Sequence, residues 1–481
     1  MAEIVKVEGL ARYDIQQYGR LLMQMPNFRK RGDEIRAYVE KMFAHGTIIA
    51  IDEAGKLMGF IGFYANDFEG KAAYWSSLAV DPSLRGQGWG LRLLNCARAM
   101  SWEAGMQTAG GTVLKENARA LQLYRWFGFE MSECMNDPTR YSLKLKLEPP
   151  KVSIVCLAYN AASYIREALE SFLQQKTNFT IEILIHDDAS TDGTAEIIRD
   201  YANKNPGLIR AVFQTENQLS KGVVASSTFL WPLIRGKYVA VCEADDYWTD
   251  LHKLQKQVDW LDAHPESSIC FHPVVVHFED GSHKDSIYPS PKDCPDGFTF
   301  KGLLRHNYIQ TNSVMFRWKL KGREEDVPTG IAPRDWFTNL LHAEKGPIGY
   351  ISETMGVYRR HPGGVWWSNP DAPDAFYLRN GFRHLAFYRA VRQRFGYDNP
   401  AALSLAANTL VTELRSGNME RAVDVVRAYP EYIRHALEMV ADRERLEREL
   451  ARARRRLNRV AWLAAAAVAL LLAALCAGIM A

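Results

Sequence analysis

Acidic and amide side chains follow several short apolar runs in the middle of the chain. The stretches are YNAAS from Tyr159, HDDASTDGT from His186, CEADDYW from Cys242 and PRDWF around Asp335. Polar residues at the carboxyl ends of parallel strands lie on the ligand-binding edge of a doubly wound sheet. Carboxylate oxygens there suit Mg²⁺ or Mn²⁺, and either cation can neutralise a departing diphosphate. A single acidic pair is more often a solvated turn, but this ordered series predicts a site for a metal ion and a diphosphate.

A glycine loop, RGQGWG from Arg85 to Gly90, is the second pattern that could do chemistry. It follows an apolar run and the turn at Pro82, and it leads into the amphipathic stretch LRLLNCARAM. Glycines let the main chain approach a pyrophosphate, and a helix N-terminus favours an anion. The spacing G-x-G-x-G differs from the G-x-G-x-x-G pattern of dinucleotide folds. The loop therefore indicates a phosphate compound, but a glycine loop alone does not identify it.

Three blocks of secondary structure must position these residues. Up to Leu147, strand-like runs such as KLMGFIGFYA alternate with amphipathic helices, which predicts an α/β domain over 1–147. Pro149 and Pro150 then mark a linker. From 151 to 375, apolar runs such as VSIVCLAY alternate with helical segments in a βαβαβ rhythm, which predicts a doubly wound sheet. Residues 376–459 read as helices, with a possible short coiled coil.

Composition and charge exclude several classes of protein. A chain of 481 residues with 47% hydrophobic and 24% charged residues predicts two or three packed domains. The formal charge is +3, but residues 442–459 alone contain eight arginines and four acidic residues. The rest of the chain is close to neutral, so no broad basic field predicts nucleic-acid binding. The seven cysteines include no C-x-x-C pair, which favours free thiols over disulfides or a zinc site. The charged N-terminus argues against a secretory signal.

The C-terminal segment differs from the rest of the chain. Residues 460–481 are 22 in number and include no charged side chain. As a helix they would reach roughly 33 Å, enough to cross a hydrocarbon core of about 30 Å. Arginines immediately before this segment predict a single-pass membrane protein with its catalytic domains on the cytoplasmic side. The alternatives are a buried core helix or an oligomerisation helix, and a homodimer through a helix at 436–460 is also possible.

The segment ENARALQLYRWFGFE adds to the glycine loop. Together they resemble the GNAT family of acetyl-CoA-dependent N-acyltransferases over most of residues 3–147. The resemblance implies that backbone amides of the loop hold the pyrophosphate of acetyl-CoA and that strand residues near Val80 read the acetyl carbonyl. The implied cofactor residues are Leu78, Val80, Arg85, Gln87, Gly88, Trp89, Gly90 and Asn117. Tyr124 would protonate the leaving thiolate, since a phenol and a thiol are weak acids of similar strength. Tyr124 could instead be a core aromatic, and no general base is evident, although Glu103 or a water chain could serve.

The middle block resembles the family 2 glycosyltransferases with the A-type nucleotide-sugar fold. VSIVCLAYNAASYIREALESFLQQ, ILIHDDASTDGT and GKYVAVCEADDYWTDLHKLQKQVDWL carry this resemblance over roughly 150–265. It implies a nucleotide-sugar site at Ala158, Tyr159, Asn160, Asp187, Asp188, Asp245 and Arg359. It also implies a metal site at Asp245, Asp246 and His361. Glu243 departs from the D-x-D-like motif but keeps a carboxylate.

Two residues of this block have a structural alternative. Asp335 fits the catalytic base of an inverting displacement, but it could instead be a helix cap or a surface ion-pair partner. His361 could complete the metal shell, although a lone histidine is usually structural.

The favoured hypothesis is a membrane-anchored bifunctional transferase in surface-glycan biosynthesis. One domain would acetylate an amine, plausibly on an amino sugar. The other would transfer a sugar from a nucleotide donor to a glycan or lipid-linked acceptor. Two alternatives stay open: a glycosyltransferase whose GNAT domain only binds acyl-CoA or a partner, and a membrane scaffold without catalysis. The donor and both acceptors are not identified by these patterns.

Overall fold

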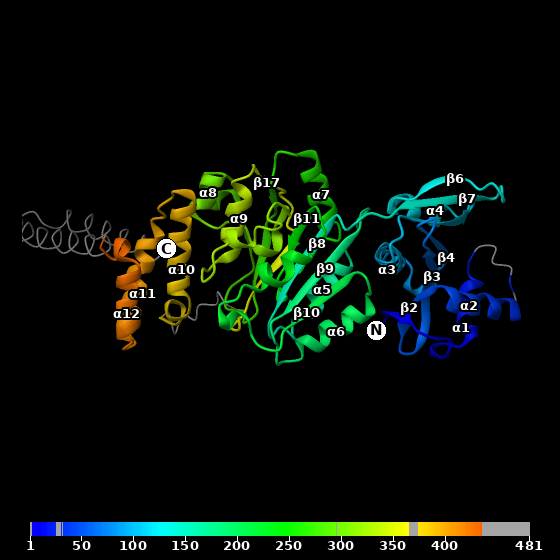
Figure 1. Cartoon of the computed structure of the whole chain (residues 1–481), viewed down its shortest axis with the longest axis horizontal. Helices are drawn as coiled ribbons and strands as arrows, with labels where there is room; N and C mark the ends of the chain where they lie inside the picture. Colours follow the sequence, from blue (N-terminus) through cyan, green and yellow to red (C-terminus); the bar gives the residue numbers. More distant parts are fainter. Residues whose placement is uncertain (1, 26–29, 31, 295, 365–373, 435–481) are drawn as a thin grey trace, which may run out of the picture. The chain divides into compact units, whose positions relative to one another are not determined.

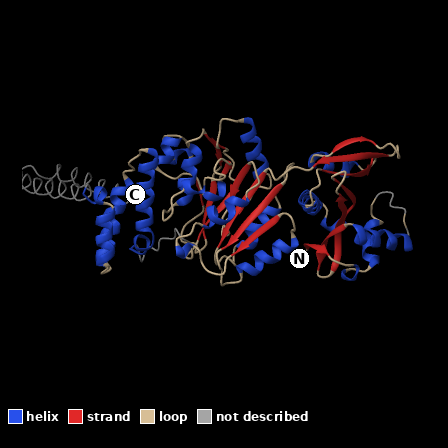
Figure 2. Cartoon of the chain, viewed as in Figure 1, coloured by secondary structure: helices blue, strands red, loops and turns tan. Residues whose placement is uncertain are grey.

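The computed structural model describes residues 2–25, 30, 32–294, 296–364 and 374–434 of the chain. It divides into two compact units. The first consists of Met1–Asp326 and Asn339–Arg359, and the second of Val327–Thr338 and Arg360–Ala481. The first unit contains three β-sheets with their helices, and the second is helical (Figures 1 and 2).

The N-terminal part of the first unit is built on a seven-stranded sheet. In spatial order its strands are β1 (Glu3–Val7), β2 (Thr47–Glu53), β3 (Lys56–Asp67), β4 (Ala72–Val80), β5 (Thr108–Leu114), β7 (Arg140–Lys146) and β6 (Glu130–Glu133). Neighbouring strands are antiparallel, with the exception of β4 and β5, which are parallel. This confirms the predicted α/β domain.

Helices cover both faces of this sheet because its strands are apolar on both faces. In β2, Ile48 and Ala50 pack with one helix pair, whereas Ile49 and Ile51 pack with the other. The helices are α1 (Ile15–Leu22) and α2 (Asp33–His45) on the first face, and α3 (Trp89–Glu103) and α4 (Ala118–Phe127) on the second.

The central sheet has a parallel half and a mixed half. Its order is β10 (Ile209–Phe213), β9 (Ile181–Asp187), β8 (Val152–Ala158), β11 (Tyr238–Val241), β16 (Met315–Arg317), β13 (Ile269–Phe271) and β17 (Ile348–Tyr350). The pairs β10–β9, β9–β8 and β8–β11 are parallel, which confirms the predicted βαβαβ unit. Strand β16 is antiparallel to both of its neighbours, which the βαβαβ rhythm does not predict.

Three amphipathic helices build the core of this sheet. They are α5 (Ile165–Leu173), α6 (Thr194–Lys204) and α7 (Lys253–Ala263). In α5, Ile165, Leu169 and Phe172 are fully buried at the spacing of one helix face. They pack with Ile154 of β8 and Ile183 of β9 in one hydrophobic cluster. This packing fixes the ends of β8, β9 and β11, where the candidate ligands follow.

A small four-stranded sheet and two short helices complete this part of the chain. The strands are β12 (Tyr247–Trp248), β18 (Gly356–Arg360), β14 (Val274–Phe278) and β15 (Ser286–Tyr288), and the helices are α8 (Phe300–Arg305) and α9 (Arg334–Ala343). Strand β12 follows the acidic loop directly and pairs antiparallel with β18. The small sheet therefore ties the late segment near Arg359 to the acidic loop.

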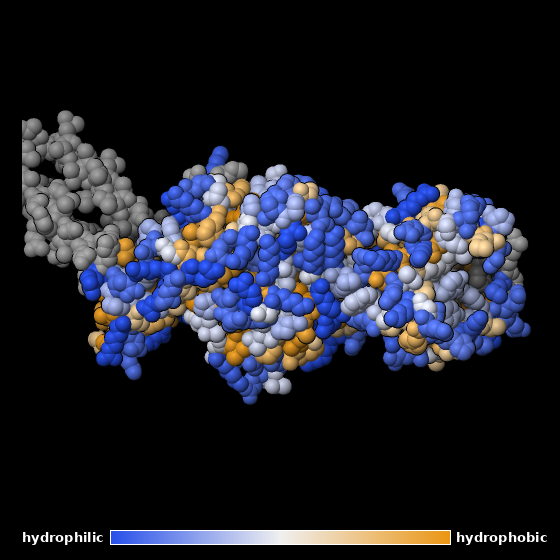
Figure 3. Space-filling model, turned by 45° about the horizontal axis from the view of Figure 1, so that its top comes forward, coloured by the Kyte–Doolittle hydropathy of each residue, from blue (hydrophilic) through white to orange (hydrophobic). Residues whose placement is uncertain are grey.

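The second unit is made of α10 (Asp374–Phe395), α11 (Ala401–Arg415), α12 (Met419–Ala428) and the first turn of α9. Trp336 of α9 packs on Phe387 of α10, with ring centroids 4.6 Å apart. Several apolar side chains of α11 and α12 stay exposed, among them Leu414, Met419 and Val426. Apolar surface is visible over these helices in Figure 3.

The prediction of a single-pass membrane protein is wrong for the part of the chain that the structure describes. None of its helices there is long and apolar enough to cross a bilayer. The longest of them, α10, has 22 residues but includes five arginines. Each arginine at a bilayer centre costs at least about 2.5–3.5 kcal/mol. The segment 460–481 and the predicted dimer helix at 436–460 lie outside the described residues. The predicted localisation, single-pass with the catalytic domains on the cytoplasmic side, depended on the membrane helix and is therefore not supported either.

Candidate functional site

The glycine loop begins α3 in a way that leaves the helix N-terminus open to an anion. Gly88 is the N-cap residue with φ +86°, and no side chain of the described residues caps the helix there. Gly86 has φ +84°, and an added Cβ at either glycine would meet no atom within 4 Å. The first amides of an uncapped helix need acceptors, and the helix dipole favours a negative one. These features fit the pyrophosphate of acetyl-CoA.

The side chains of the loop hold its shape. The Arg85 guanidinium donates to the Val80 carbonyl at 2.9 Å, and the Gln87 amide donates to the Ser83 carbonyl at 2.9 Å. The guanidinium of Arg92 lies 4.7 Å from the centre of the Trp89 ring. The predicted role of Arg85 and Gln87 in binding cofactor stays a prediction, but their observed contacts stabilise the loop.

Strands β4 and β5 separate beside this loop. Their pairing is confined to Ala72–Tyr74 of β4 and Thr108–Gly110 of β5 in the described chain. Beyond Tyr74, the segment that contains Leu78 and Val80 pairs with β3 alone. Backbone groups on the β5 side of that segment are therefore available to a ligand, which fits the predicted reading of an acetyl carbonyl.

Tyr124 lies on α4, where its ring packs against Phe129 with centroids 5.3 Å apart. Burial raises the pKa of the Tyr124 phenol to about 12. The hydroxyl therefore keeps its proton at neutral pH, as an acid catalyst must. The phenol is nevertheless a weaker acid than the ordinary pKa of tyrosine suggests, so proton transfer to a thiolate near pKa 8.5 is uphill.

Two other residues near α4 and α3 have structural partners. Asn117 is the N-cap residue of α4, and its Oδ1 accepts the amide of Ala120 at 3.1 Å. The candidate base Glu103 is the last residue of α3, at the opposite end from the glycine loop, and it lies 3.6 Å from Arg235. Helix geometry puts about 20 Å between the two ends of α3. Glu103 is thus poorly placed to act at the acetyl group.

In the central sheet, the loops after β8 and β9 are joined by hydrogen bonds. The amide of Asp188 donates to the carbonyl of Ala158 at 3.0 Å, and the amide of Thr191 donates to Asn160 Oδ1 at 2.8 Å. Asn160 has φ +49°, a conformation that asparagine tolerates better than most residues. Ala158, Asn160 and Asp188 are therefore brought together at the carboxyl edge of the sheet, as predicted. Tyr159 is exposed beside them.

The two aspartates after β9 differ in their partners. Both oxygens of Asp188 are used, because Oδ1 accepts the amide of Gln218 at 2.8 Å and Oδ2 that of Leu219 at 3.1 Å. Asp187 accepts the amide of Ser190 at 3.2 Å through Oδ2. Its Oδ1 is buried and has no hydrogen-bond partner among the residues that the structure describes. A buried acceptor without a donor is costly, so Asp187 is the better placed of the two to bind a donor group of a nucleotide base.

The acidic loop after β11 forms a compact cluster of three carboxylates. Oxygens of Glu243, Asp245 and Asp246 all lie within 4.8 Å of one another. Asp246 is buried, and burial followed by the charge of Asp245 raises its pKa well above the ordinary value. Carboxylates this close repel one another unless a cation neutralises them. The cluster therefore fits Mg²⁺ or Mn²⁺, with hard oxygen ligands and excess negative charge.

Arg359 stands beside this cluster, but its side chain is already occupied. The guanidinium lies 3.1 Å from Glu279 and also bonds Glu167. It is 5.2 Å from the centre of the Tyr164 ring and 4.6 Å from that of Tyr247. Its predicted contact with the donor diphosphate stays a prediction. Sequence reasoning missed both glutamates: Glu167 lies in a stretch that carries the glycosyltransferase resemblance but was given no role, and Glu279 falls in no recognised motif.

Asp335 and His361 belong to the second compact unit, whereas the acidic cluster belongs to the first. Asp335 is the second residue of α9, where a carboxylate also favours the helix dipole. His361 follows β18. The roles of Asp335 as catalytic base and of His361 as metal ligand stay predictions.

Comparison with known proteins separates the chain into two regions. Residues 153–362 match the family described as "Glycosyl transferase family 2", and residues 16–129 match the "Acetyltransferase (GNAT) family". The putative teichuronic acid biosynthesis glycosyltransferase TuaG of Bacillus subtilis is 30% identical over 211 residues, which cover 44% of this chain and 79% of that protein. The chain belongs to the family 2 glycosyltransferases. It carries a GNAT domain ahead of the glycosyltransferase domain, so the predicted fusion is confirmed.

Other relatives cover less of their own length. The uncharacterized protein Rv1520 of Mycobacterium tuberculosis is 46% identical over 217 residues, which are 45% of this chain and 61% of that protein. The crystal structure of S. aureus TarS 1-349 in complex with UDP-GlcNAc is 17% identical, with a TM-score of 0.37. It covers 55% of this chain and 73% of that one. The chain therefore spans about three fifths of its mycobacterial relatives.

Proposed function

We propose that the chain is a bifunctional transferase that acts in the assembly of a surface glycan. Its glycosyltransferase domain would move a sugar from a nucleotide donor to a glycan or lipid-linked acceptor, with inversion. Its GNAT domain would transfer an acetyl group from acetyl-CoA to the amine of an amino sugar. TuaG supports the glycan assignment, because its name places it in teichuronic acid biosynthesis.

The observation that carries the first activity is the cluster of Glu243, Asp245 and Asp246 within 4.8 Å. It follows β11, and the buried, unpartnered oxygen of Asp187 ends β9 in the parallel half of the same sheet. A divalent cation held by the cluster would neutralise the charge of the departing nucleoside diphosphate. Asp187 would accept a hydrogen bond from the base. In the reaction the acceptor oxygen bonds the anomeric carbon, the bond from that carbon to the diphosphate breaks, and Asp335 takes the hydroxyl proton.

The second activity rests on the uncapped N-terminus of α3 and the separation of β4 from β5. The loop amides would bind the pyrophosphate. The amine nitrogen bonds the acetyl carbon, the carbon–sulfur bond breaks, and Tyr124 donates its proton to the sulfur. A proton released by the amine returns to solvent, from which Tyr124 is reprotonated.

Two observations favour a second candidate for the GNAT domain. The pKa of Tyr124 is raised to about 12, and Glu103 is paired with Arg235 far from the loop. A domain that binds acyl-CoA without turnover needs neither a matched acid nor a base. The glycosyltransferase would then be the only enzyme on the chain.

The experiment screens the full chain against nucleotide sugars in Mn²⁺ and, separately, against amines with labelled acetyl-CoA. We expect donor hydrolysis or transfer from one nucleotide sugar, and a loss of at least about 100-fold in Asp245→Ala. Asp259→Ala, an exposed aspartate of α7, is the matched control. Full activity of Asp245→Ala would contradict the metal assignment. Acetyl-CoA binding without transfer to any amine would support the second candidate.

A further inference from the structure

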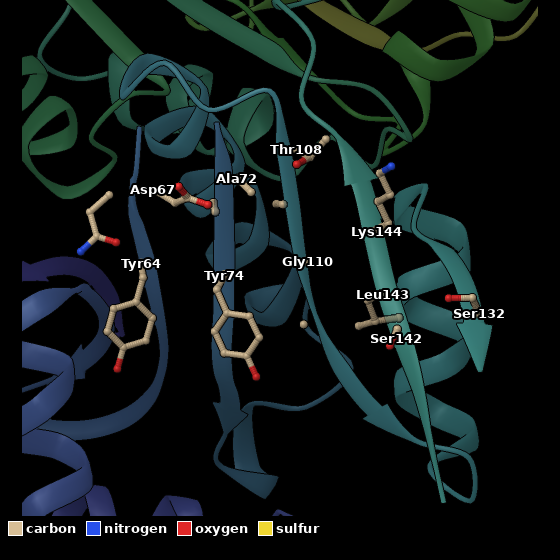
Figure 4. Close-up of a pocket in the computed structure, with 14 residues that line it drawn as sticks. Tyr64, Asp67, Ala72, Tyr74, Thr108, Gly110, Ser132, Ser142, Leu143 and Lys144 are labelled. Carbon is tan, nitrogen blue, oxygen red and sulfur yellow. The ribbon is translucent and has the colours of Figure 1, made fainter. Parts of the chain in front are cut away.

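A groove of about 490 Å³ lies on the N-terminal sheet, on the face away from α3 and α4 (Figure 4). The alternation of β4 sets this orientation. Ala73 and Trp75 are buried in the cluster that contains α3 and α4, so Tyr74 between them points to the other face. Helices α1 and α2 cover that face over β2 and β3, but the described chain leaves Tyr74 49% exposed.

The wall of the groove is a row of residues in register across four strands. Tyr64 is paired with Tyr74, Tyr74 with Gly110, and Gly110 with Lys144. The rings of Tyr64 and Tyr74 have centroids 6.5 Å apart and planes tilted by 32°. Figure 4 shows the two rings side by side on neighbouring strands, with their hydroxyls toward the same end. They form a platform about two rings wide.

The floor beside this platform is bare backbone. A Cβ at Gly110 would lie 2.9 Å from the carbonyl oxygen of Leu143, and one at Gly111 would lie 2.7 Å from that of Trp75. No side chain can therefore stand at either position without moving a neighbouring strand. Consecutive glycines inside a strand commonly mark the close approach of another backbone or a ligand. Gly110, in register with Tyr74 and Lys144, leaves room between these two side chains, whereas Gly111 alternates to the face of Ala109 and Val113.

The chemistry of the lining favours a sugar. Aromatic faces are electron-rich and attract the polarised C–H bonds on the flat side of a pyranose. Asp67 offers an acceptor and Lys144 donors for ring hydroxyls, together with Ser132 and Ser142. Among the described residues of the lining, Asp67 and Lys144 alone are charged, so their charges cancel and a polyanion gains nothing.

The position of the groove along β4 sets the size of the ligand. Leu78, in the segment expected to read the acetyl carbonyl, is four residues beyond Tyr74. At about 3.3 Å per residue, this is about 13 Å along the strand. A single hexose on Tyr74 would not reach the acetyl group, whereas the next residue of an oligosaccharide would.

We propose that this groove binds a pyranose ring of an oligosaccharide whose neighbouring amino sugar is acetylated. The inference rests on the proposed acetyltransferase function and names its substrate class. It also gives an order of reactions: glycosyl transfer precedes acetylation, because the acceptor must already contain a glycosidic bond.

The test compares glucosamine with its β-1,4-linked disaccharide as acceptor for the full chain. We expect a lower KM for the disaccharide, and a rise of that KM by at least about tenfold in Tyr74→Ala. The KM for glucosamine should stay unchanged. Phe68→Ala removes an exposed aromatic that does not line the groove, and it should change neither KM. Equal KM values for both acceptors in the wild type would overturn the inference.

A binding measurement separates the inference from the acetyl transfer itself. Titration calorimetry with the N-acetylated disaccharide, which is already acetylated, reports sugar binding without acetyl transfer, and the difference between wild type and Tyr74→Ala reports the groove. Loss of this binding in Tyr74→Ala without any acetyl transfer in the wild type would refute the proposed acetyltransferase and keep the sugar site. Unchanged binding in Tyr74→Ala would refute the sugar site.

Discussion

The backbone amide of Arg359 donates a hydrogen bond to Asp246 Oδ1 at 2.8 Å, although the two residues are 113 positions apart. Strand β18 thereby fixes the most buried carboxylate of the acidic cluster. The amide stabilises the charged form of Asp246 without adding a full positive charge. That contribution is smaller than the effect of burial, which keeps the pKa of Asp246 high.

This relationship predicts how the stability of the metal-free protein depends on pH. A pKa that is raised in the folded state means that protonated Asp246 stabilises the fold at low pH. That stability is lost as pH rises from about 4 through the raised pKa. In chelated protein we expect the melting temperature to fall over this range more steeply than in Asp246→Asn. Added Mn²⁺ should raise the melting temperature again in the wild type alone, by about 2–4 °C for each kcal/mol that metal binding adds to the free energy of unfolding. Identical melting curves for the two proteins would contradict the assignment.

Arg359→Lys should distinguish the role of the Arg359 guanidinium from that of its main-chain amide. Lysine cannot contact Glu167 and Glu279 as the planar guanidinium does, so we expect a loss of about 1–3 kcal/mol in the free energy of unfolding. The amide bond to Asp246 is kept, and Mn²⁺ affinity should therefore change little. Urea unfolding and manganese titration measure the two effects. A large rise in the KM for donor at unchanged stability would instead show that the side chain binds the diphosphate.

Gly88→Ala tests the glycine loop, and Gly105→Ala, just beyond the other end of α3, is the matched control. Both Gly88 and Gly105 have φ +86°, and neither has an atom within 4 Å of an added Cβ. Each alanine should cost about 1–2 kcal/mol through backbone strain. Only Gly88→Ala should also weaken acetyl-CoA binding, by about tenfold, since 1.4 kcal/mol is a factor of ten. Calorimetric titration distinguishes them, and equal affinities would place the cofactor elsewhere.

Tyr124→Phe tests the acid. If Tyr124 protonates the thiolate, kcat for acetyl transfer should fall by about 100-fold or more at an unchanged KM for acetyl-CoA. Because its pKa is about 12, the wild-type rate should show no loss from Tyr124 ionisation up to pH 10. The ring contact with Phe129 survives in phenylalanine, so the melting temperature should hold. Tyr141→Phe, on β7, is the control. An unchanged kcat in Tyr124→Phe would favour the binding-module alternative.

The fold of both regions could be predicted because their signals are local. The apolar run of β8, the amphipathic face of α5 and the turn residues after Asp187 all specify neighbouring structure. The burial of Glu182 could not be predicted, because it depends on a distant partner. Glu182 is the second residue of β9 and has no exposed surface, and it accepts from Ser153 at 2.6 Å and from Arg235 at 2.7 Å.

The candidate sites divide in the same way. Motif residues such as Gly88 and Asp245 could be named from short patterns. The two ion pairs of Arg359 depend on Glu167 and Glu279, which come from separate parts of the chain that meet only after folding. The tyrosine pair of the groove depends on the register between β3 and β4, which the spacing of apolar residues does not specify. The membrane prediction rested on one uncharged segment, its length and the arginines before it, and the described helices do not support it.

The two glycines under the groove also bear on how this protein can change over evolutionary time. A Cβ at either position would lie too close to a carbonyl oxygen of the adjacent strand. Neither Gly110 nor Gly111 can therefore be substituted unless the sheet itself shifts. A change in the preferred acceptor would then require substitutions in the side chains of the groove wall, at positions such as Tyr64, Tyr74 and Lys144, which can be substituted one at a time. Orthologues that modify different glycans should therefore differ at these wall side chains and keep both glycines.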